Sequence, residues 1–181
     1  MKKHKSFLLV CFLLLSLYSC RDSYQSKIIS NVNERAPEFL IDANKMMIEY
    51  EEKIIDSLLN ISTIPFSKDN SGIRICLNKN NKNDSTAFPD DGDNITILYN
   101  CVIFDDVNLI SNDVLVDTIR FKIGHSKQMK GLNYAIKLLK VGDKAKIIIP
   151  SYLGFGMSGY GKTVPPYSTL LLNVKLLNIK K

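Results

Sequence analysis

Residues 140–177 read KVGDKAKIIIPSYLGFGMSGYGKTVPPYSTLLLNVKLL, and this stretch decides the fold. Within it, residues 154–159 match the G-x-G-x-x-G pattern of dinucleotide-binding loops, and residues 156–163 match the G-x-x-x-x-G-K-[ST] phosphate loop. Both patterns require a helix to follow, because its N-terminal amides hold the phosphate. Here Pro165 and Pro166 follow, and two successive prolines exclude a helix interior. We therefore interpret both matches as coincidences and expect no nucleotide. The glycines are instead expected to be turn residues with positive φ: Gly154, Gly156, Gly159 and Gly161.

The hydrophobic periodicity along the rest of the chain predicts several strands and two helices. Apolar residues alternate with polar ones in residues 73–78, which is typical of a strand with one buried face. Residues 129–139 show helical spacing, and strand-like segments precede and follow them. This order predicts an α+β fold in which an antiparallel β-sheet wraps around one short α-helix.

A second helical pattern covers residues 37–60, with apolar residues at three-to-four-residue spacing among charged ones. Such a helix commonly packs on its own domain, and a dimerisation or partner-binding role is the alternative. The apolar positions are Phe39, Leu40, Met46, Met47, Ile54, Ile55, Leu58 and Leu59.

The N-terminus has the pattern of a secretory signal peptide. In residues 1–19 a basic segment precedes an apolar run, and a small residue then precedes Cys20. Residues 17–20, Leu-Tyr-Ser-Cys, resemble a bacterial lipobox, so Cys20 is the expected lipidation site. An uncleaved membrane anchor is the alternative, although the apolar run is shorter than the roughly 20 residues that span a bilayer. Cys76 and Cys101 would remain, as two buried thiols or as a disulfide that an exported compartment permits.

The charge of the chain limits the classes of partner. The net charge is +6, and it falls to +3 once the three lysines of the signal peptide are removed. That balance gives little support for nucleic-acid binding. The only histidines are His4, in the signal peptide, and His125, so no metal site is expected. The expected organisation is a signal peptide at 1–19, a lipidated cysteine and polar tether at 20–36, an amphipathic helix at 37–65 and a globular domain at 66–181.

A larger motif uses the same residues as the rejected phosphate patterns. Residues 141–150 read V-G-D-K-A-K-I-I-I-P, residues 154–156 read G-F-G, and residues 164–177 read V-P-P-Y-S-T-L-L-L-N-V-K-L-L. Together these segments resemble the FKBP-type peptidyl-prolyl cis-trans isomerases, and the resemblance covers roughly residues 89–180. A lipobox before such a domain is also similar to gliding-motility-associated FKBP-like lipoproteins.

This resemblance implies a curled sheet with an apolar pocket between sheet and helix, no cofactor, and isomerisation of X-Pro bonds. The resemblance implies that Tyr167 would lie in a loop over the pocket and that the backbone N–H of Met129 would bind the substrate carbonyl. The residues it places at the site are Tyr99, Met129, Phe155 and Tyr167 as catalytic, and Leu109, Ile119, Leu132, Val164 and Leu172 as substrate-binding.

The sequence departs from the family pattern at several pocket positions. Leu132 stands where the floor is often tryptophan, and aromatic wall positions of the family fall on Leu109, Ile119 and Leu172. The ungapped match puts Ile110 where the family has an aspartate, so that Asp113 would reach the site only after a loop shift. Phe155 stands where the family has a tyrosine. Ile110 and Phe155 favour one alternative to a proline isomerase for exported proteins, a weak or inactive FKBP-like chaperone. The family resemblance alone suggests another, a structural lipoprotein of a motility or secretion apparatus. The expected location is the bacterial envelope, on the periplasmic side and preferably at the outer membrane, with proline-containing polypeptides as clients.

Overall fold

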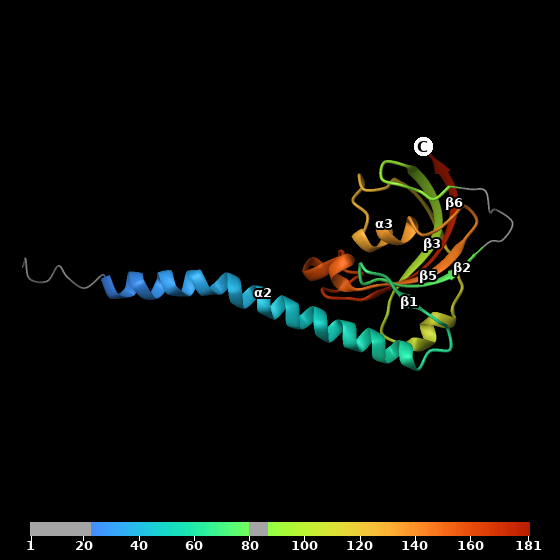
Figure 1. Cartoon of the computed structure of the whole chain (residues 1–181). Helices are drawn as coiled ribbons and strands as arrows, with labels where there is room; N and C mark the ends of the chain where they lie inside the picture. Colours follow the sequence, from blue (N-terminus) through green and yellow to red (C-terminus); the bar gives the residue numbers. More distant parts are fainter. Residues whose placement is uncertain (1–22, 80–86) are drawn as a thin grey trace, which may run out of the picture. The chain divides into compact units, whose positions relative to one another are not determined.

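The computed structural model describes residues 23–79 and 87–181, including the side chains from Glu38 onward in the first helix. The signal peptide expected at residues 1–19 and the lipidation site Cys20 lie outside these residues. The chain divides into two units, 1–47 and 48–181. The described part of the first unit is helical, and all strands belong to the second (Figure 1).

Helix α2 runs from Ser23 to Asn60, and so begins earlier than the helix expected from residue 37. Residues 23–36, predicted as a polar tether, are helical in their backbone. The sequence pattern placed the start at Pro37 because the helical spacing of apolar residues begins only after it. Residues 23–36 contain neither glycine nor proline, so no residue type there interrupts the helix. None of the described helices combines the length and hydropathy that a membrane span requires.

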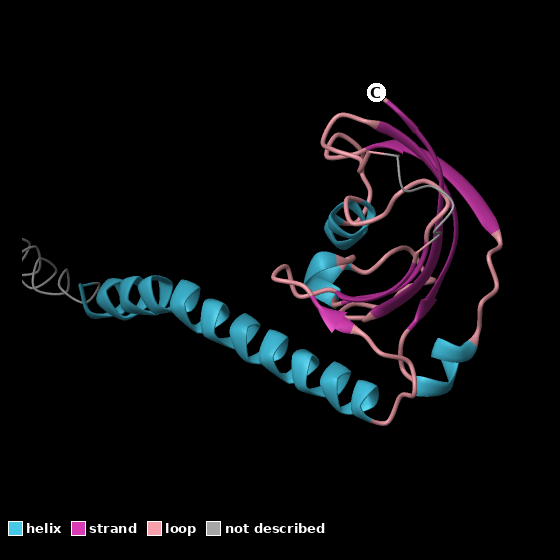
Figure 2. Ribbon diagram, turned by 45° about the vertical axis from the view of Figure 1, so that its right-hand side comes forward, coloured by secondary structure: helices cyan, strands magenta, loops and turns pink. Residues whose placement is uncertain are grey.

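Six antiparallel strands form one sheet in the order β1-β2-β5-β6-β3-β4. The sheet is curled, and the short helix α3 lies on its concave side (Figure 2). The predicted α+β fold class is therefore confirmed, with the N-terminal helix added. The bounds are β1 Ser67–Lys68, β2 Arg74–Asn78, β3 Asn94–Ile103, β4 Asp117–Lys122, α3 Lys130–Ile136, β5 Lys144–Ile149 and β6 Leu170–Lys180.

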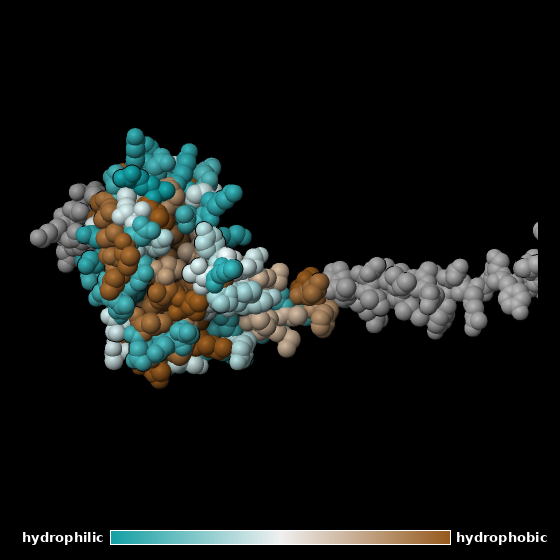
Figure 3. Space-filling model, turned by 180° about the vertical axis from the view of Figure 1, so that it is seen from behind, coloured by the Kyte–Doolittle hydropathy of each residue, from teal (hydrophilic) through white to brown (hydrophobic). Residues whose placement is uncertain are grey.

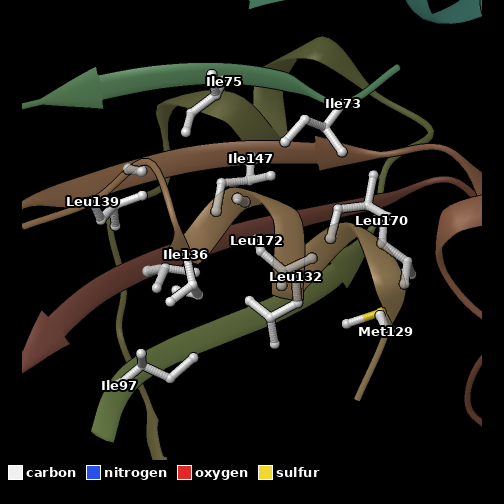
Figure 4. Close-up of a cluster of buried hydrophobic side chains, with 14 of the residues drawn as sticks. Ile73, Ile75, Ile97, Met129, Leu132, Ile136, Leu139, Ile147, Leu170 and Leu172 are labelled. Carbon is white, nitrogen blue, oxygen red and sulfur yellow. The ribbon is translucent and has the colours of Figure 1, made fainter. Parts of the chain in front are cut away.

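The concave face of the sheet and α3 enclose the main core, which we call the inner cluster (Figure 4). Gly131 allows close packing here, because a Cβ at this position would lie 2.5 Å from Cγ2 of Ile149 on β5. The buried members labelled in Figure 4 are Ile73, Ile75, Ile97, Met129, Leu132, Ile136, Leu139, Ile147, Leu170 and Leu172.

The opposite face of the sheet carries a second, smaller core, which we call the outer cluster. Its buried members are Ile55 of α2, Phe104, Ile110, Ile148 of β5 and Leu171 of β6. Ile148 and Leu171 alternate with inner-cluster residues along their strands, and successive strand residues point to opposite faces. The central strands β5 and β6 are therefore covered on both sides. On the face seen in Figure 3, hydrophobic side chains gather in patches between hydrophilic ones.

The last turns of α2 are also joined to the sheet by ion pairs. Arg74 of β2 is 1 % exposed, and its guanidinium donates to both carboxylate oxygens of Glu52, at 2.9 and 2.7 Å. It also donates to Oδ1 of Asp56, at 2.5 and 3.2 Å. Burial of a guanidinium is tolerated only when such partners compensate its lost hydration. Residues 48–60 of the helix are thus part of the folded domain.

Candidate active site

The loop between β5 and β6, residues 150–169, carries three of the predicted site residues, and we call it the pocket loop. It leaves the sheet where Ile149 pairs with Leu170. Two 3-10 turns, Ser151–Leu153 and Gly156–Ser158, give it internal structure. A bridge between Tyr160 and Val164, with N–H to O distances of 2.8 and 3.1 Å, closes its tip. The pocket loop is therefore an ordered hairpin above the end of the sheet.

The glycines in this loop act largely as expected. Gly156, Gly159 and Gly161 have positive φ, whereas Gly154 has φ −95° and does not. Gly159 also has no room for a side chain, because a Cβ there would lie 2.3 Å from the carbonyl oxygen of Val164. A glycine at this position is thus required by both the turn and the bridge at the tip.

The structure brings most of the predicted site residues together at the inner cluster. Some of these residues are fully buried in this core, and others are packed against it while part of their side chain reaches solvent. Met129, Leu132, Val164 and Leu172 are buried members, and Tyr99, Ile119 and Phe155 are partly buried against them.

Tyr167 lies in the pocket loop with an unusual backbone conformation. Its φ is +58°, and it is the one non-glycine residue with positive φ among the described residues. Its N–H donates to the carbonyl oxygen of Gly156 at 2.9 Å, which holds the residue in this conformation. The side chain is 44 % exposed, and no described residue accepts or donates a hydrogen bond at its hydroxyl. Left-handed backbone at a bulky residue costs free energy and persists where the surroundings impose it, often at functional sites.

Tyr99 on β3 faces an acidic residue that the sequence pattern did not identify. Tyr99 is directly opposite Asp117 of β4 in the strand register, so both side chains lie on the concave face. Burial raises the pKa of Tyr99, and the negative charge of Asp117 raises it further. Strand alternation could have found this residue, because Asp117 lies two and four residues before Ile119 and Phe121, which face the inner cluster.

An aromatic pair at the pocket loop was also missed. The rings of Phe155 and Tyr160 are stacked, with centroids 4.9 Å apart and planes inclined by 28°. The sequence offers two aromatic residues five apart in a glycine-rich loop, but no period that would bring them into contact. The pair widens the apolar wall that Phe155 alone was expected to supply.

Two predictions about the acid position are wrong. Leu109, predicted to bind substrate, is packed against the outer cluster, and Ile110 is a buried member of it. Apolar residues of the 3-10 turn Val107–Ser111 belong to or pack against the outer cluster, on the other face of the sheet from α3, so they do not line the candidate site. Asp113 forms an ion pair with Lys146, which lies on that outer face, and does not approach Tyr99.

The backbone N–H of Met129, at the N-terminal end of α3, is a hydrogen-bond donor at the candidate site. Met129 is the residue before the first helical residue, and its carbonyl accepts from the N–H of Asn133 at 3.1 Å. No acceptor for the backbone N–H of Met129 is found in the part of the chain that the structure describes. An N–H at a helix start without an internal partner is available to a ligand carbonyl.

Two further observations concern metal-binding side chains and the two cysteines. Within residues 23–79 and 87–181, no group of three His, Cys, Asp or Glu residues is placed to hold a metal ion. Cys101 is a free thiol on the inner face, and burial raises its pKa to about 11. Cys76 is also free, and it alternates with Ile75, which places it on the outer face, so the two cysteines do not pair.

Comparison with known proteins agrees with this geometry. Residues 85–177 match the family model described as FKBP-type peptidyl-prolyl cis-trans isomerase. The FK506-binding protein 1 of Kluyveromyces lactis is 35 % identical over 96 residues, which is 53 % of this chain and 84 % of that protein. Human peptidyl-prolyl cis-trans isomerase FKBP14 is 45 % identical over 62 residues, covering 34 % of this chain and 29 % of that one.

Solved structures show the same fold at low identity. FkpA from Escherichia coli superposes with a TM-score of 0.56 at 18 % identity, covering 99 % of this chain and 83 % of that one. A peptidyl-prolyl cis-trans isomerase from Pseudomonas syringae gives a TM-score of 0.58 at 16 % identity, covering 76 % and 96 %. The chain belongs to the family of FKBP-type peptidyl-prolyl cis-trans isomerases. Its enzyme class is accordingly that of the peptidyl-prolyl cis-trans isomerases.

Proposed function

We propose that the partly exposed apolar surface on the concave face of the sheet binds the proline of X-Pro segments in exported polypeptides and catalyses cis-trans isomerisation there. The observation that carries this proposal is the convergence of apolar walls from β3, β4, α3 and the pocket loop on one partly exposed site. The planar X-Pro amide is held by resonance, with a barrier to rotation near ~18–20 kcal/mol. An apolar wall cannot solvate the charge-separated planar form as water does. The less polar twisted amide is relatively favoured there.

In this proposal two hydrogen-bond donors orient the substrate. The backbone N–H of Met129 and the hydroxyl of Tyr167 have no partners among the described residues, so each can donate to a substrate carbonyl. Neither group transfers a proton, and the reaction requires no nucleophile. Their role is to fix the carbonyls on either side of the proline while the bond between them rotates.

Two sequence observations, Ile110 and Phe155, favoured the chaperone alternative, and we infer that only Phe155 still favours it. It relied on Ile110 as a replaced pocket acid, but Ile110 belongs to the outer cluster. In this proposal Asp117, opposite Tyr99 in the strand register, supplies a carboxylate on the concave face instead. Phe155 still lacks the hydroxyl of the family tyrosine, and we expect this to reduce affinity by no more than one hydrogen bond, about 0.5–1.5 kcal/mol.

The test is the isomerisation of short X-Pro peptides by the purified protein, with the residue before proline varied. Tyr167→Ala should lower kcat/KM by about tenfold or more, which corresponds to roughly 1.4 kcal/mol of transition-state binding. Tyr134→Ala is a matched control, because Tyr134 on α3 is also 44 % exposed but is not part of the proposed site. Turnover at the uncatalysed rate by folded protein would refute the enzyme and leave a binding module.

We also propose attachment to the bacterial envelope through a lipid on Cys20, with clients among exported proteins. The signal-like residues 1–19 and the lipobox-like residues 17–20 support this proposal. Mass spectrometry of the mature N-terminus should find a diacylglyceryl-modified Cys20, and Cys20→Ser should release the protein from membranes. An unmodified N-terminus in the membrane fraction would contradict lipidation.

A further inference from the structure

Both ends of the pocket loop are held by one carboxylate from outside the sheet. Glu51, in the last turns of α2, accepts at Oε1 from the backbone N–H of Ser151 at 2.6 Å and from Oγ1 of Thr169 at 2.5 Å. Its Oε2 accepts from Oγ of Ser151 at 2.7 Å. Ser151 directly follows the first residue of the loop, and Thr169 is its last residue. The carboxylate therefore ties together the two chain segments where the loop leaves the sheet.

The contact to Ser151 satisfies a group that has no local partner. Ser151 begins a 3-10 turn and is buried, and the preceding Pro150 offers no side-chain cap. A buried N–H left without an acceptor is costly, and hydrogen bonds to a carboxylate are stronger than neutral ones. Glu51 thus acts as a cap for the first turn of the pocket loop, supplied from a residue 100 positions away in the sequence.

The neighbouring residue of α2 supports the same attachment. Glu52 accepts from the hydroxyl of Tyr152 at 2.9 Å, and the ion pair with Arg74 anchors Glu52 to β2. The hydroxyl of Tyr152 fits against Gly72, where a Cβ would lie 2.1 Å from it. Two consecutive helix residues therefore fix two consecutive loop residues, so the orientation of the loop depends on the end of α2.

We infer that Glu51 is a positioning residue for the proposed isomerase site, acting through the pocket loop on Phe155, Val164 and Tyr167. This inference rests on the proposed function of the pocket. Glu51 does not touch the pocket itself, so the residue sets how often the loop presents its side chains in a binding-competent arrangement. A loop that is competent for only a fraction of the time weakens apparent substrate affinity by that fraction.

The first test compares Glu51→Gln with Glu49→Gln. Both substitutions remove one negative charge from the same helix, but Glu49 is exposed and has no hydrogen-bond partner among the described residues. Glu51→Gln should raise KM about five- to tenfold and leave kcat within about twofold, because competent loops still react normally. Glu49→Gln should match the wild type. Equal KM values for the two variants would overturn the inference.

Hydrogen exchange separates a positioning role from general stabilisation without relying on activity. The amides of Leu153, Gly154 and Tyr167 are hydrogen-bonded within the loop. Their exchange should be about tenfold faster in Glu51→Gln, while the amides of β5 and β6 keep their protection. A uniform increase over loop and strands would mean a structural role only and would overturn the inference.

A double-mutant cycle tests whether the effect passes through the loop ends. Thr169→Val keeps the shape of the side chain and removes its hydroxyl, and it should raise KM less than Glu51→Gln does. The double variant should be no worse than Glu51→Gln alone, because the shared contact is already lost. Additive effects would overturn the proposed connection. If the wild type shows no turnover, the proposed function fails. Hydrogen exchange of residues 150–169 then tests by itself whether Glu51 holds the pocket loop.

Discussion

Glu52→Ala is expected to destabilise the folded domain, because it removes the main partner of a buried guanidinium. The side chain of Arg74 is 2 % exposed, compared with 16 % for Glu52 and 53 % for Asp56. Glu52 provides both carboxylate oxygens, whereas Asp56 provides one. After the substitution the guanidinium keeps Asp56 and the carbonyl oxygen of Gly72, at 2.8 Å. The guanidinium then has one carboxylate partner in place of two, and because it is buried, water can replace the lost one only poorly.

The size of the effect follows from this partial compensation. Removing one partner of a fully buried ion pair costs about 3–5 kcal/mol. Because Asp56 remains, we expect a loss of about 2 kcal/mol in the free energy of unfolding. For a unit of this length, that is a decrease in Tm of roughly 6–12 °C. Urea unfolding and thermal circular dichroism measure both quantities, with Glu49→Ala as the control. Equal stability of the two variants would refute the importance of the pair.

The same residue predicts a pH dependence of stability. Burial opposes the charge on Glu52, but hydrogen bonds from Arg74, Lys68 and Tyr152 outweigh it and lower its pKa from 4.5 to about 2. The unfolded chain therefore binds this proton at higher pH than the folded chain does. The stabilisation is complete above pH 4.5 and disappears as the pH falls towards 2. The stability difference between wild type and Glu52→Ala should shrink over this interval, and a constant difference would contradict the assignment.

Three further substitutions test the packing and the site. Gly131→Ala should cost about 1–3 kcal/mol of stability, because the new methyl would lie 2.5 Å from Cγ2 of Ile149. A companion Ile149→Ala change that recovered none of the loss in urea unfolding would argue against this contact. Ile110→Asp restores an acid at the position suggested by the family match, yet it should cost about 3 kcal/mol and leave kcat/KM no higher. A folded variant with higher kcat/KM would place Ile110 in the pocket after all. Asp117→Asn should lower the pKa of Tyr99, which burial and then this charge raise, and spectrophotometric titration against Tyr99→Phe measures it. An unchanged pKa would mean that Asp117 does not face the ring.

The strands and the pocket loop could be predicted because their signals are local. In residues 73–78, for example, apolar and polar residues alternate, and Ile73 and Ile75 lie in the inner cluster as that pattern predicts. Leu172, which was predicted to bind substrate, is a buried member of the same cluster. The bridge at the loop tip depends on Gly159 and on the prolines that follow it, all of which lie within a few residues.

The position of Ile110 could not be predicted in this way. This chain and the family pattern have the same number of residues between the positions of Tyr99 and Ile119. The sequence therefore gives no sign that the backbone between them turns to the other face of the sheet. What decides its place is the apolar contact with Ile55 and Ile148, which come from two other elements. That contact depends on where α2 ends, and the apolar period of the helix shows a buried face without showing its partner.

Polar contacts between segments distant in the sequence could not be predicted from it either. Glu51 looked like one of several solvent-exposed acids on a charged helix, and Glu49 has the same local pattern. The two differ only because Ser151 and Thr169 lie beside one of them in the folded chain. No residue type or spacing near Glu51 distinguishes it.

The double coverage of β5 and β6 determines how the protein can be divided. Ile148 and Leu171 share their strands with Ile147 and Leu172, so the two clusters cannot melt independently. A truncation that removes residues 48–60 would uncover one side of the central strands, and the resulting fragment would be prone to aggregation. The boundary implied by the family match, near residue 85, is therefore not a boundary at which this protein can be cut. Its smallest independent piece includes the end of the helix that precedes the family domain.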